Sequence, residues 1–198
     1  MTDTEHFRAL ETMYLAASIN RIYKPTIAVA EGRADIEIEI AEKFFHAAGA
    51  VHGSVYFKML DDAAYFAANS LEREFFLLTA SFTTYLTHPI TSGVVKSVGT
   101  VGTRTGRQFI AESVAYNSDG QEIGRGNGLF VRGKCPLRDV AGYGRPQRTT
   151  ALGRKQTGKW NMFVRDGLGW TRYQAISTPK YISTRCLSWM YSFNTGLR

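Results

Sequence analysis

The chain has 198 residues, which fits one ordinary domain, and its 44% hydrophobic and 21% charged residues are typical of a globular protein rather than a disordered one. No run of about 18 apolar residues is present, so we expect no membrane-spanning helix. The first residues, M-T-D-T-E-H-F-R, lack the basic and apolar regions of a signal peptide. The two cysteines, Cys135 and Cys186, have no metal-binding spacing, so we expect free thiols in a cytoplasmic protein.

The net charge of +7 is unevenly distributed along the chain. Residues 1–135 carry 13 Lys and Arg against 15 Asp and Glu, whereas residues 136–198 carry 11 against two. The last third also contains all three tryptophans and shows neither a helical nor a strand period. We therefore predict a folded domain at 1–135 and a basic tail at 136–198 that is poorly structured or non-native. A shifted reading frame or read-through near residue 145 would explain such a tail.

The first 135 residues alternate between patterns that predict helices and patterns that predict strands. Thr2 and Glu5 form a capping box before an apolar repeat at helical spacing. Ser54 is the expected N-cap of a second helix, which is apolar on most sides and therefore wrapped by other elements. The predicted elements are helices at 3–18 and 54–71 and strands at 25–30, 36–40, 75–86, 93–103, 108–117 and 121–132. Short turns between the last four strands favour an antiparallel sheet packed on the second helix, an α+β domain.

The second predicted helix carries two adjacent carboxylates, Asp61 and Asp62. Lys58 precedes Asp62 by four residues, so these two side chains should form an ordinary helical ion pair. Asp61 lies at the edge of the polar side among apolar residues, where burial raises the pKa of a carboxylate and makes it a stronger base. Asp61 is therefore the candidate catalytic group. The alternative is that both aspartates are solvated surface residues.

The start of this helix is a candidate binding site for a carbonyl oxygen. N–H groups in the first turn of a helix lack internal partners, and a carbonyl oxygen placed there gains hydrogen bonds and the positive end of the helix dipole. Gly53 is the candidate donor, because a side chain at this position would block close approach; alternatively, it merely permits a turn. His52 either binds substrate or orients the loop.

The order of elements and the motif at residues 49–61 together resemble the hotdog-fold acyl-CoA thioesterases. The similarity covers roughly residues 10–134 and is greatest to the phenylacetate-pathway type within the 4-hydroxybenzoyl-CoA thioesterase superfamily. The family motif is a glycine, then His-Gly-Gly, with an acidic residue eight positions after the first glycine of that pair. This chain has Gly49, then His52-Gly53-Ser54, and Asp61. It departs from the family at Ser54, in place of the second glycine, and at His46, where relatives often have asparagine.

The resemblance implies an antiparallel sheet wrapped around a long central helix, and hydrolysis of an acyl-CoA thioester to a free acid and coenzyme A. Asp61 would act as base or nucleophile, the backbone N–H of Gly53 would polarise the carbonyl, and Thr79 would hold the attacking water or the carboxylate. We further expect substrate contacts from His46, Ser54, Ser81 and Arg107, the last being, with Arg104 and Arg132, a candidate for the nucleotide phosphates. No cofactor or metal is expected. The pocket of this family lies between subunits, so a homodimer or homotetramer is expected.

Two other functions remain open at the level of sequence. A non-hydrolytic hotdog protein, such as a coenzyme A-binding regulator or an acyl dehydratase, would share the fold. The spacing from His52 to Asp61 favours the thioesterase, because dehydratases combine histidine and acid differently. The basic tail with its tryptophans is the second alternative, a nucleic-acid-binding module. It has no regular aromatic spacing and no RNA-binding motif, so a nucleic-acid partner is not expected.

Overall fold

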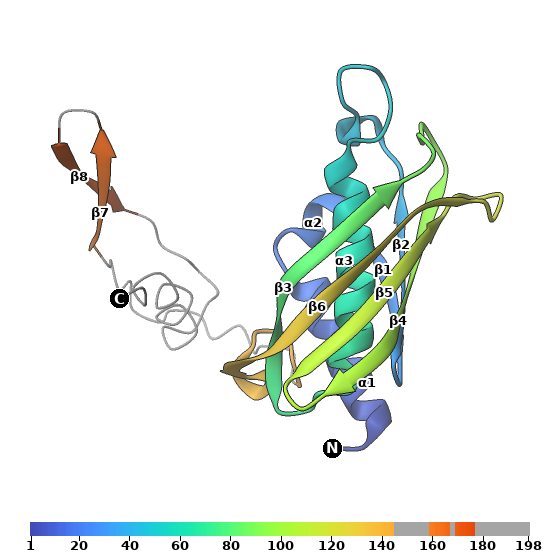
Figure 1. Cartoon of the computed structure of the whole chain (residues 1–198), viewed down its shortest axis with the longest axis horizontal. Helices are drawn as coiled ribbons and strands as arrows, with labels where there is room; N and C mark the ends of the chain where they lie inside the picture. Colours follow the sequence, from blue (N-terminus) through green and yellow to red (C-terminus); the bar gives the residue numbers. More distant parts are fainter. Residues whose placement is uncertain (145–158, 167–168, 177–198) are drawn as a thin grey trace, which may run out of the picture.

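A computed structural model describes residues 1–144, 159–166 and 169–176 of the chain (Figure 1). Every helix and strand predicted within the first 135 residues is confirmed, with ends that differ by a few residues. Two short elements between them, α2 and η1, were not predicted. The described elements are α1 (Asp3–Ala16), α2 (Asn20–Tyr23), β1 (Thr26–Ala30), β2 (Arg33–Glu39), η1 (Glu42–Phe44), α3 (Gly53–Asn69), β3 (Phe75–Leu86), β4 (Val94–Thr105), β5 (Gln108–Tyr116), β6 (Glu122–Pro136), η2 (Leu137–Asp139), β7 (Lys159–Asp166) and β8 (Gly169–Ile176).

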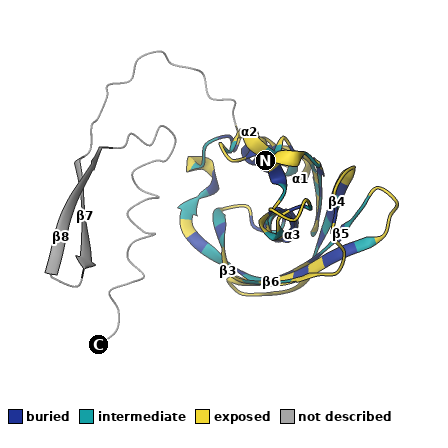
Figure 2. Ribbon diagram, turned by 90° about the horizontal axis from the view of Figure 1, so that it is seen from above, coloured by how far each residue is buried: buried dark blue, intermediate teal, exposed yellow. Residues whose placement is uncertain are grey.

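The six strands β1 to β6 form one antiparallel sheet in the order β1-β2-β4-β5-β6-β3. The sheet curves around α3, and α1 lies on the side of this helix that the sheet leaves open (Figure 2). This arrangement confirms the predicted α+β fold with a sheet wrapped around a long central helix. Strand β3 lies at one edge of this sheet.

Helix α3 is buried along most of its length because the sheet packs on it and Tyr14 of α1 contacts Phe66 and Asp62 on its remaining side. Close packing against β4 requires glycine at position 99, since a Cβ there would lie 2.1 Å from the carbonyl oxygen of Ala63. The prediction that Ser54 is the N-cap of this helix is wrong. The helix begins at Gly53, and His52 is the cap, its Nδ1 accepting a hydrogen bond of 3.1 Å from the backbone N–H of Ser54. The ring nitrogen of His52 accepts this hydrogen bond in place of a serine hydroxyl oxygen. It can do so because it lies close to the N–H groups of the first helical turn, which lack partners within the helix.

The packed domain continues beyond the expected boundary at residue 135. Strand β6 runs to Pro136, Leu137 is fully buried, and the following turn packs on α1. Gly142 allows this contact, because it has a φ of +87° and a Cβ there would lie 2.8 Å from Cβ of Ala16. We name residues 137–144 the strap. Composition alone placed the boundary too early, because the charge of a segment does not report which of its apolar residues reach the core.

Two further expectations need correction. Strands β7 and β8 pair over eight residues each, so the expectation that the tail is poorly structured is wrong for this hairpin; the other residues after 144 lie outside the described ranges. Cys135 is disulfide-bonded rather than free, and Cys186 lies outside the described residues. Among the described residues, no helix is both long and apolar enough to span a membrane.

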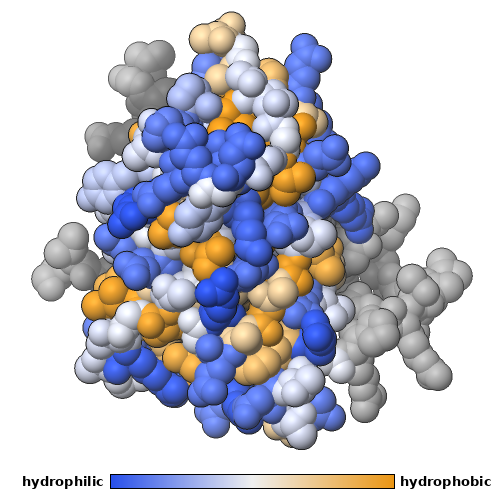
Figure 3. All heavy atoms as spheres, turned by 90° about the vertical axis from the view of Figure 1, so that its right-hand side faces the viewer, coloured by the Kyte–Doolittle hydropathy of each residue, from blue (hydrophilic) through white to orange (hydrophobic). Residues whose placement is uncertain are grey.

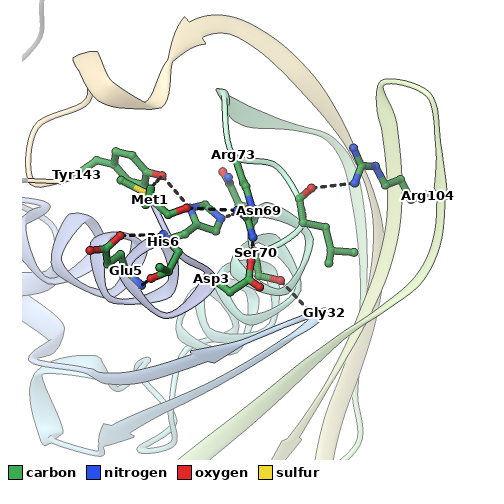
Figure 4. Close-up of polar contacts among 12 residues, drawn as sticks. Met1, Asp3, Glu5, His6, Gly32, Asn69, Ser70, Arg73, Arg104 and Tyr143 are labelled. Atoms are coloured by element: carbon green, nitrogen blue, oxygen red, sulfur yellow. Dashed lines mark hydrogen bonds and ion pairs between the residues drawn. The ribbon is translucent and has the colours of Figure 1, made fainter.

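A buried histidine joins the strap to both helices (Figure 4). His6 of α1 contacts the hydroxyl of Tyr143 through Nδ1 at 2.7 Å and the backbone carbonyl of Asn69, at the end of α3, through Nε2 at 3.1 Å. A carbonyl only accepts, so Nε2 carries the proton and Nδ1 accepts from Tyr143. Both ring nitrogens of this neutral, fully buried histidine therefore have hydrogen-bond partners.

Replacing His6 by glutamine should destabilise the fold by roughly 1–3 kcal/mol, because Tyr143 and Asn69 lose buried partners. Burial lowers the pKa of His6 in the folded protein, so the unfolded chain alone binds a proton as the pH falls below 6.5. The contribution of His6 is therefore present above that pH and is lost below it. Urea unfolding at pH 7.5 and 5.5 should show a smaller difference between wild type and His6→Gln at the lower pH. The exposed His46→Gln is the control, and an equal difference at both pH values would contradict this.

Candidate active site

Asp61 lies in the middle of α3 and faces the edge strand β3. The hydroxyl of Thr79 on β3 donates a hydrogen bond to Asp61, with Oγ1 3.2 Å from Oδ1 and 3.5 Å from Oδ2. Burial, and secondly the negative charge of Asp62, raise the pKa of Asp61 to about 6, while Thr79 and Lys58 act in the opposite direction. A carboxyl group with this pKa is mostly ionised at neutral pH and is a better proton acceptor than an ordinary aspartate.

A cavity of about 710 Å³ adjoins this carboxyl group. It lies between the C-terminal part of α1, helix α3, the first half of β3 and the strap. Its walls are mainly apolar and include Met13, Ala17, Phe66, Phe76, Leu78 and Val140. The polar side chains on its α3 wall are Lys58, Asp61 and Asp62. A mainly apolar cavity with a few converging polar groups is the usual form of a small-molecule site.

Ser81, expected beside Thr79, lies on the other face of the sheet. The pairing of β3 with β6 shifts between Thr79 and Ser81, where Thr79 is opposite Phe130 and Ser81 is opposite Leu129. Phe82 stacks edge-to-face on Phe57 of α3, which puts Phe82 and not Ser81 on the helix side. This bulge breaks the simple alternation that the prediction assumed. Thr79 is therefore brought to Asp61 and Ser81 is not.

Gly53 is the first residue of α3, and its N–H is open. The N–H of Ser54 donates to the His52 side chain and that of Val55 to the His52 carbonyl, at 3.1 and 2.9 Å. The Gly53 N–H has no acceptor in the part of the chain that the structure describes. Ser54 also contacts His52 through its hydroxyl, 2.8 Å from Nδ1, so both residues complete the cap. The first turn of α3 thus retains one free donor, as an oxyanion site requires.

The other expected substrate contacts lie away from Asp61. His46 accepts a hydrogen bond of 3.1 Å from the N–H of Ala48 and closes its own turn. The backbone carbonyl of Arg107 accepts from the N–H of Arg132, whose guanidinium pairs with buried Glu72 just beyond the C-terminal end of α3. Arg104 likewise donates to the carbonyl of Leu71. The three arginines therefore lie at the opposite end of the helix from Gly53. Within one protomer, these arginines and the N–H of Gly53 do not belong to the same site.

The sequence interpretation missed the contribution of α1 and of the strap. Tyr14 donates a hydrogen bond of 2.9 Å to Asp62, and Val140 and Ala141 line the cavity. Tyr14 was recognisable as part of an amphipathic helix, but no local signal shows which element that helix contacts. Within the described ranges, no three His, Cys, Asp or Glu side chains gather as metal ligands do.

Replacing Thr79 by alanine should lower turnover at pH 7 by about 10-fold, because the carboxyl group of Asp61 loses the hydrogen bond that orients it. The same bond lowers the pKa of Asp61, so its loss should move the acidic limb of the pH–rate profile to higher pH. Thr79→Ser keeps the hydroxyl and is the matched control. Steady-state thioester hydrolysis from pH 5 to 9 measures both effects. An unshifted limb in Thr79→Ala would contradict the contact.

Comparison with known proteins identifies a related family. The family model described as the thioesterase superfamily matches residues 48–123, which include all of α3. The matched segment is similar to this superfamily, and the chain has the hotdog fold. No curated protein sequence matches the chain.

Solved structures of other hotdog proteins are similar at low sequence identity. The Escherichia coli PaaI protein from the phenylacetic acid degradation operon is 14% identical, with a TM-score of 0.63 over 69% of this chain and 99% of that protein. A thioesterase from Haemophilus influenzae is 12% identical, with a TM-score of 0.56 over 61% and 85%. A mutant of a thioesterase from Staphylococcus aureus is 17% identical, with a TM-score of 0.54 over 58% and 98%. These likenesses show the common fold.

Proposed function

We propose that the protein hydrolyses an acyl-CoA thioester to a free acid and coenzyme A. The observation that carries this proposal is the carboxyl group of Asp61, whose pKa is raised to about 6 and which is held by Thr79 beside a mainly apolar cavity. A thioesterase needs such a base or nucleophile close to a space for an apolar acyl group. The match of residues 48–123 to the thioesterase superfamily supports the same reaction class.

The chemistry follows one of two routes. As a general base, ionised Asp61 takes a proton from a water molecule while the water oxygen bonds to the thioester carbon. As a nucleophile, Asp61 bonds to that carbon itself, and water then hydrolyses the resulting anhydride. In both routes the carbonyl oxygen becomes an oxyanion, and its return to a carbonyl breaks the carbon–sulfur bond and releases the coenzyme A thiolate.

The oxyanion is bound by the free N–H of Gly53, and we propose that this donor comes from a second protomer. Gly53 and Asp61 are eight residues apart on α3, a rise of about 12 Å. A donor must lie about 3 Å from the oxyanion, and a nucleophile about 3–3.5 Å from the carbonyl carbon. One protomer therefore presents the two groups too far apart for direct attack on one thioester, whereas two antiparallel copies of α3 bring Gly53 of each near Asp61 of the other.

The edge strand β3 is the surface on which we propose this pairing. Its free edge exposes backbone hydrogen-bonding groups over 12 residues, which is a template for a second strand. Large apolar side chains are exposed beside it: Phe57 is 44%, Tyr85 56% and Leu86 48% exposed. On the opposite flank, at the right of Figure 1, hydrophobic residues occur in small groups among hydrophilic ones (Figure 3). A homodimer formed through β3, or a homotetramer of two such dimers, would complete the site.

Thiol release from a panel of acyl thioesters tests the proposed reaction. The purified full chain is offered phenylacetyl-CoA, octanoyl-CoA and the corresponding acyl carrier protein thioesters, and free thiol is measured against time. Hydrolysis of a coenzyme A thioester supports the proposal. Binding of acyl-CoA without thiol release would instead support the non-hydrolytic alternative.

A further inference from the structure

A second polar group lies beside Asp61 in the same cavity. It consists of Lys58 and Asp62 of α3 and Tyr14 of α1, which we name the Lys58 cluster. Lys58 and Asp62 form the ion pair predicted from their spacing. The side chains are only 13% and 22% exposed, so the pair is more buried than an ordinary ion pair on a helix surface.

The geometry of the Lys58 cluster is defined from several sides. The hydroxyl of Tyr14 donates to Oδ2 of Asp62 at 2.9 Å, and Nζ of Lys58 lies 3.3 Å from the same hydroxyl. Nζ also lies 5.0 Å from the ring centroid of Tyr14 and 5.2 Å from that of Tyr23, both cation–π distances. Unlike an exposed ion pair, whose side chains move freely, this pair is held between α1, α2 and α3.

The cluster presents two opposite charges to the candidate catalytic carboxyl group. Asp62 follows Asp61 directly in the chain, and Lys58 precedes it by one helical turn. All three side chains line the cavity, whose mainly apolar walls weaken screening by water. The other titratable groups that face Asp61 are Tyr65 of α3, whose hydroxyl donates to the carbonyl of Leu77, and Tyr14 itself. The lining residues of β3 and of the strap carry no ionisable side chain.

We propose that Lys58, Asp62 and Tyr14 are positioning residues that set the charge state of Asp61. The proposal rests on the proposed role of Asp61 in thioester hydrolysis. Asp62 makes Asp61 more basic, Lys58 keeps it ionised at neutral pH, and Tyr14 holds both charges at fixed positions. The opposite effects of Asp62 and Lys58 on the pKa of Asp61 agree with this division. Helix α1 thereby influences chemistry on α3 without contacting the reacting atoms.

Two charge variants test the proposal because they should act in opposite directions. Asp62→Asn removes the negative neighbour and leaves Lys58 unpaired, so the pKa of Asp61 should fall by about 1 unit or more. Lys58→Met removes the positive neighbour and leaves Asp62 unpaired, so the pKa of Asp61 should rise by about 1 unit or more. Tyr14→Phe keeps both charges and the ring, so it should produce the smallest shift. Glu122→Gln, which removes an acid near Arg125 on β6, is the control for the loss of one negative charge.

The readout is a carbon-13 NMR titration of the Asp61 carboxyl group in the full-length protein, with the signal assigned from Asp61→Asn. The acidic limb of the pH–rate profile should move in the same directions. If wild type released no thiol, the proposed function would fail, but the titration would still report on the cluster. An Asp61 signal that shifts in the same direction in both charge variants, or in neither, would overturn the proposal. If one of the two charge variants does not fold, the direction of the pKa shift of Asp61 in the other variant decides whether the proposal holds.

Discussion

Asp61→Asn is expected to lower the turnover of acyl-CoA hydrolysis by about 10²–10⁴-fold. Asparagine has the same size and can still accept the hydrogen bond from Thr79, but it neither takes a proton from water nor forms an anhydride. Wild-type activity should rise with pH through about 6, because the ionised form of Asp61 is the active one and its pKa is raised to that value. Thiol release from a hydrolysed acyl-CoA, measured from pH 4.5 to 9, tests both statements.

The control for this variant is its own stability. Burial disfavours the charged form of Asp61, so the folded protein loses nothing when a neutral amide replaces the carboxylate at pH 8. The thermal unfolding midpoint of Asp61→Asn at pH 8 should therefore equal or exceed that of wild type. Full activity in a folded Asp61→Asn protein would remove Asp61 from the mechanism.

Mixing two inactive variants should restore activity if the site is shared between subunits. Gly53→Leu blocks the oxyanion site and Asp61→Asn removes the base, so each homodimer is inactive. In a mixed dimer, one site combines the intact Gly53 of one chain with the intact Asp61 of the other, while the second site carries both changes. Random exchange makes half of the dimers mixed, so about a quarter of wild-type activity should return.

This experiment separates a shared site from one contained in a single chain. The two proteins are denatured together and refolded, or co-expressed with different tags and purified through both. Refolding each variant alone is the control. Dimers that form without recovery of activity would show that Gly53 and Asp61 act within the same protomer, whereas an active Gly53→Leu homodimer would show that Gly53 has no role. A monomer in solution would contradict pairing through β3.

Local chemistry was sufficient to predict the elements of the domain and its candidate base. Hydrophobic periodicity acts within a few residues, so α3 and strands β2 to β6 were predicted nearly at their observed bounds. Asp61 and Lys58 share one helix, and helical spacing alone determines which of their neighbours are apolar. An elevated pKa of Asp61 was therefore expected, and the burial of this carboxyl group in the structure raises its pKa.

Long-range packing determined which residues surround that base. Contacts between segments that are distant in the sequence cannot be predicted from the spacing of nearby residues. A bulge in β3 placed Thr79 on the helix side and Ser81 on the other, although both were candidates. The Lys58–Asp62 pair was predicted, but its burial depends on Tyr14, 44 residues before Lys58. The Gly53 motif was visible in the sequence, whereas its open N–H depends on how His52 caps the helix. Sequence periodicity thus identified the helix and its carboxylate, and tertiary packing determined the partners that surround it.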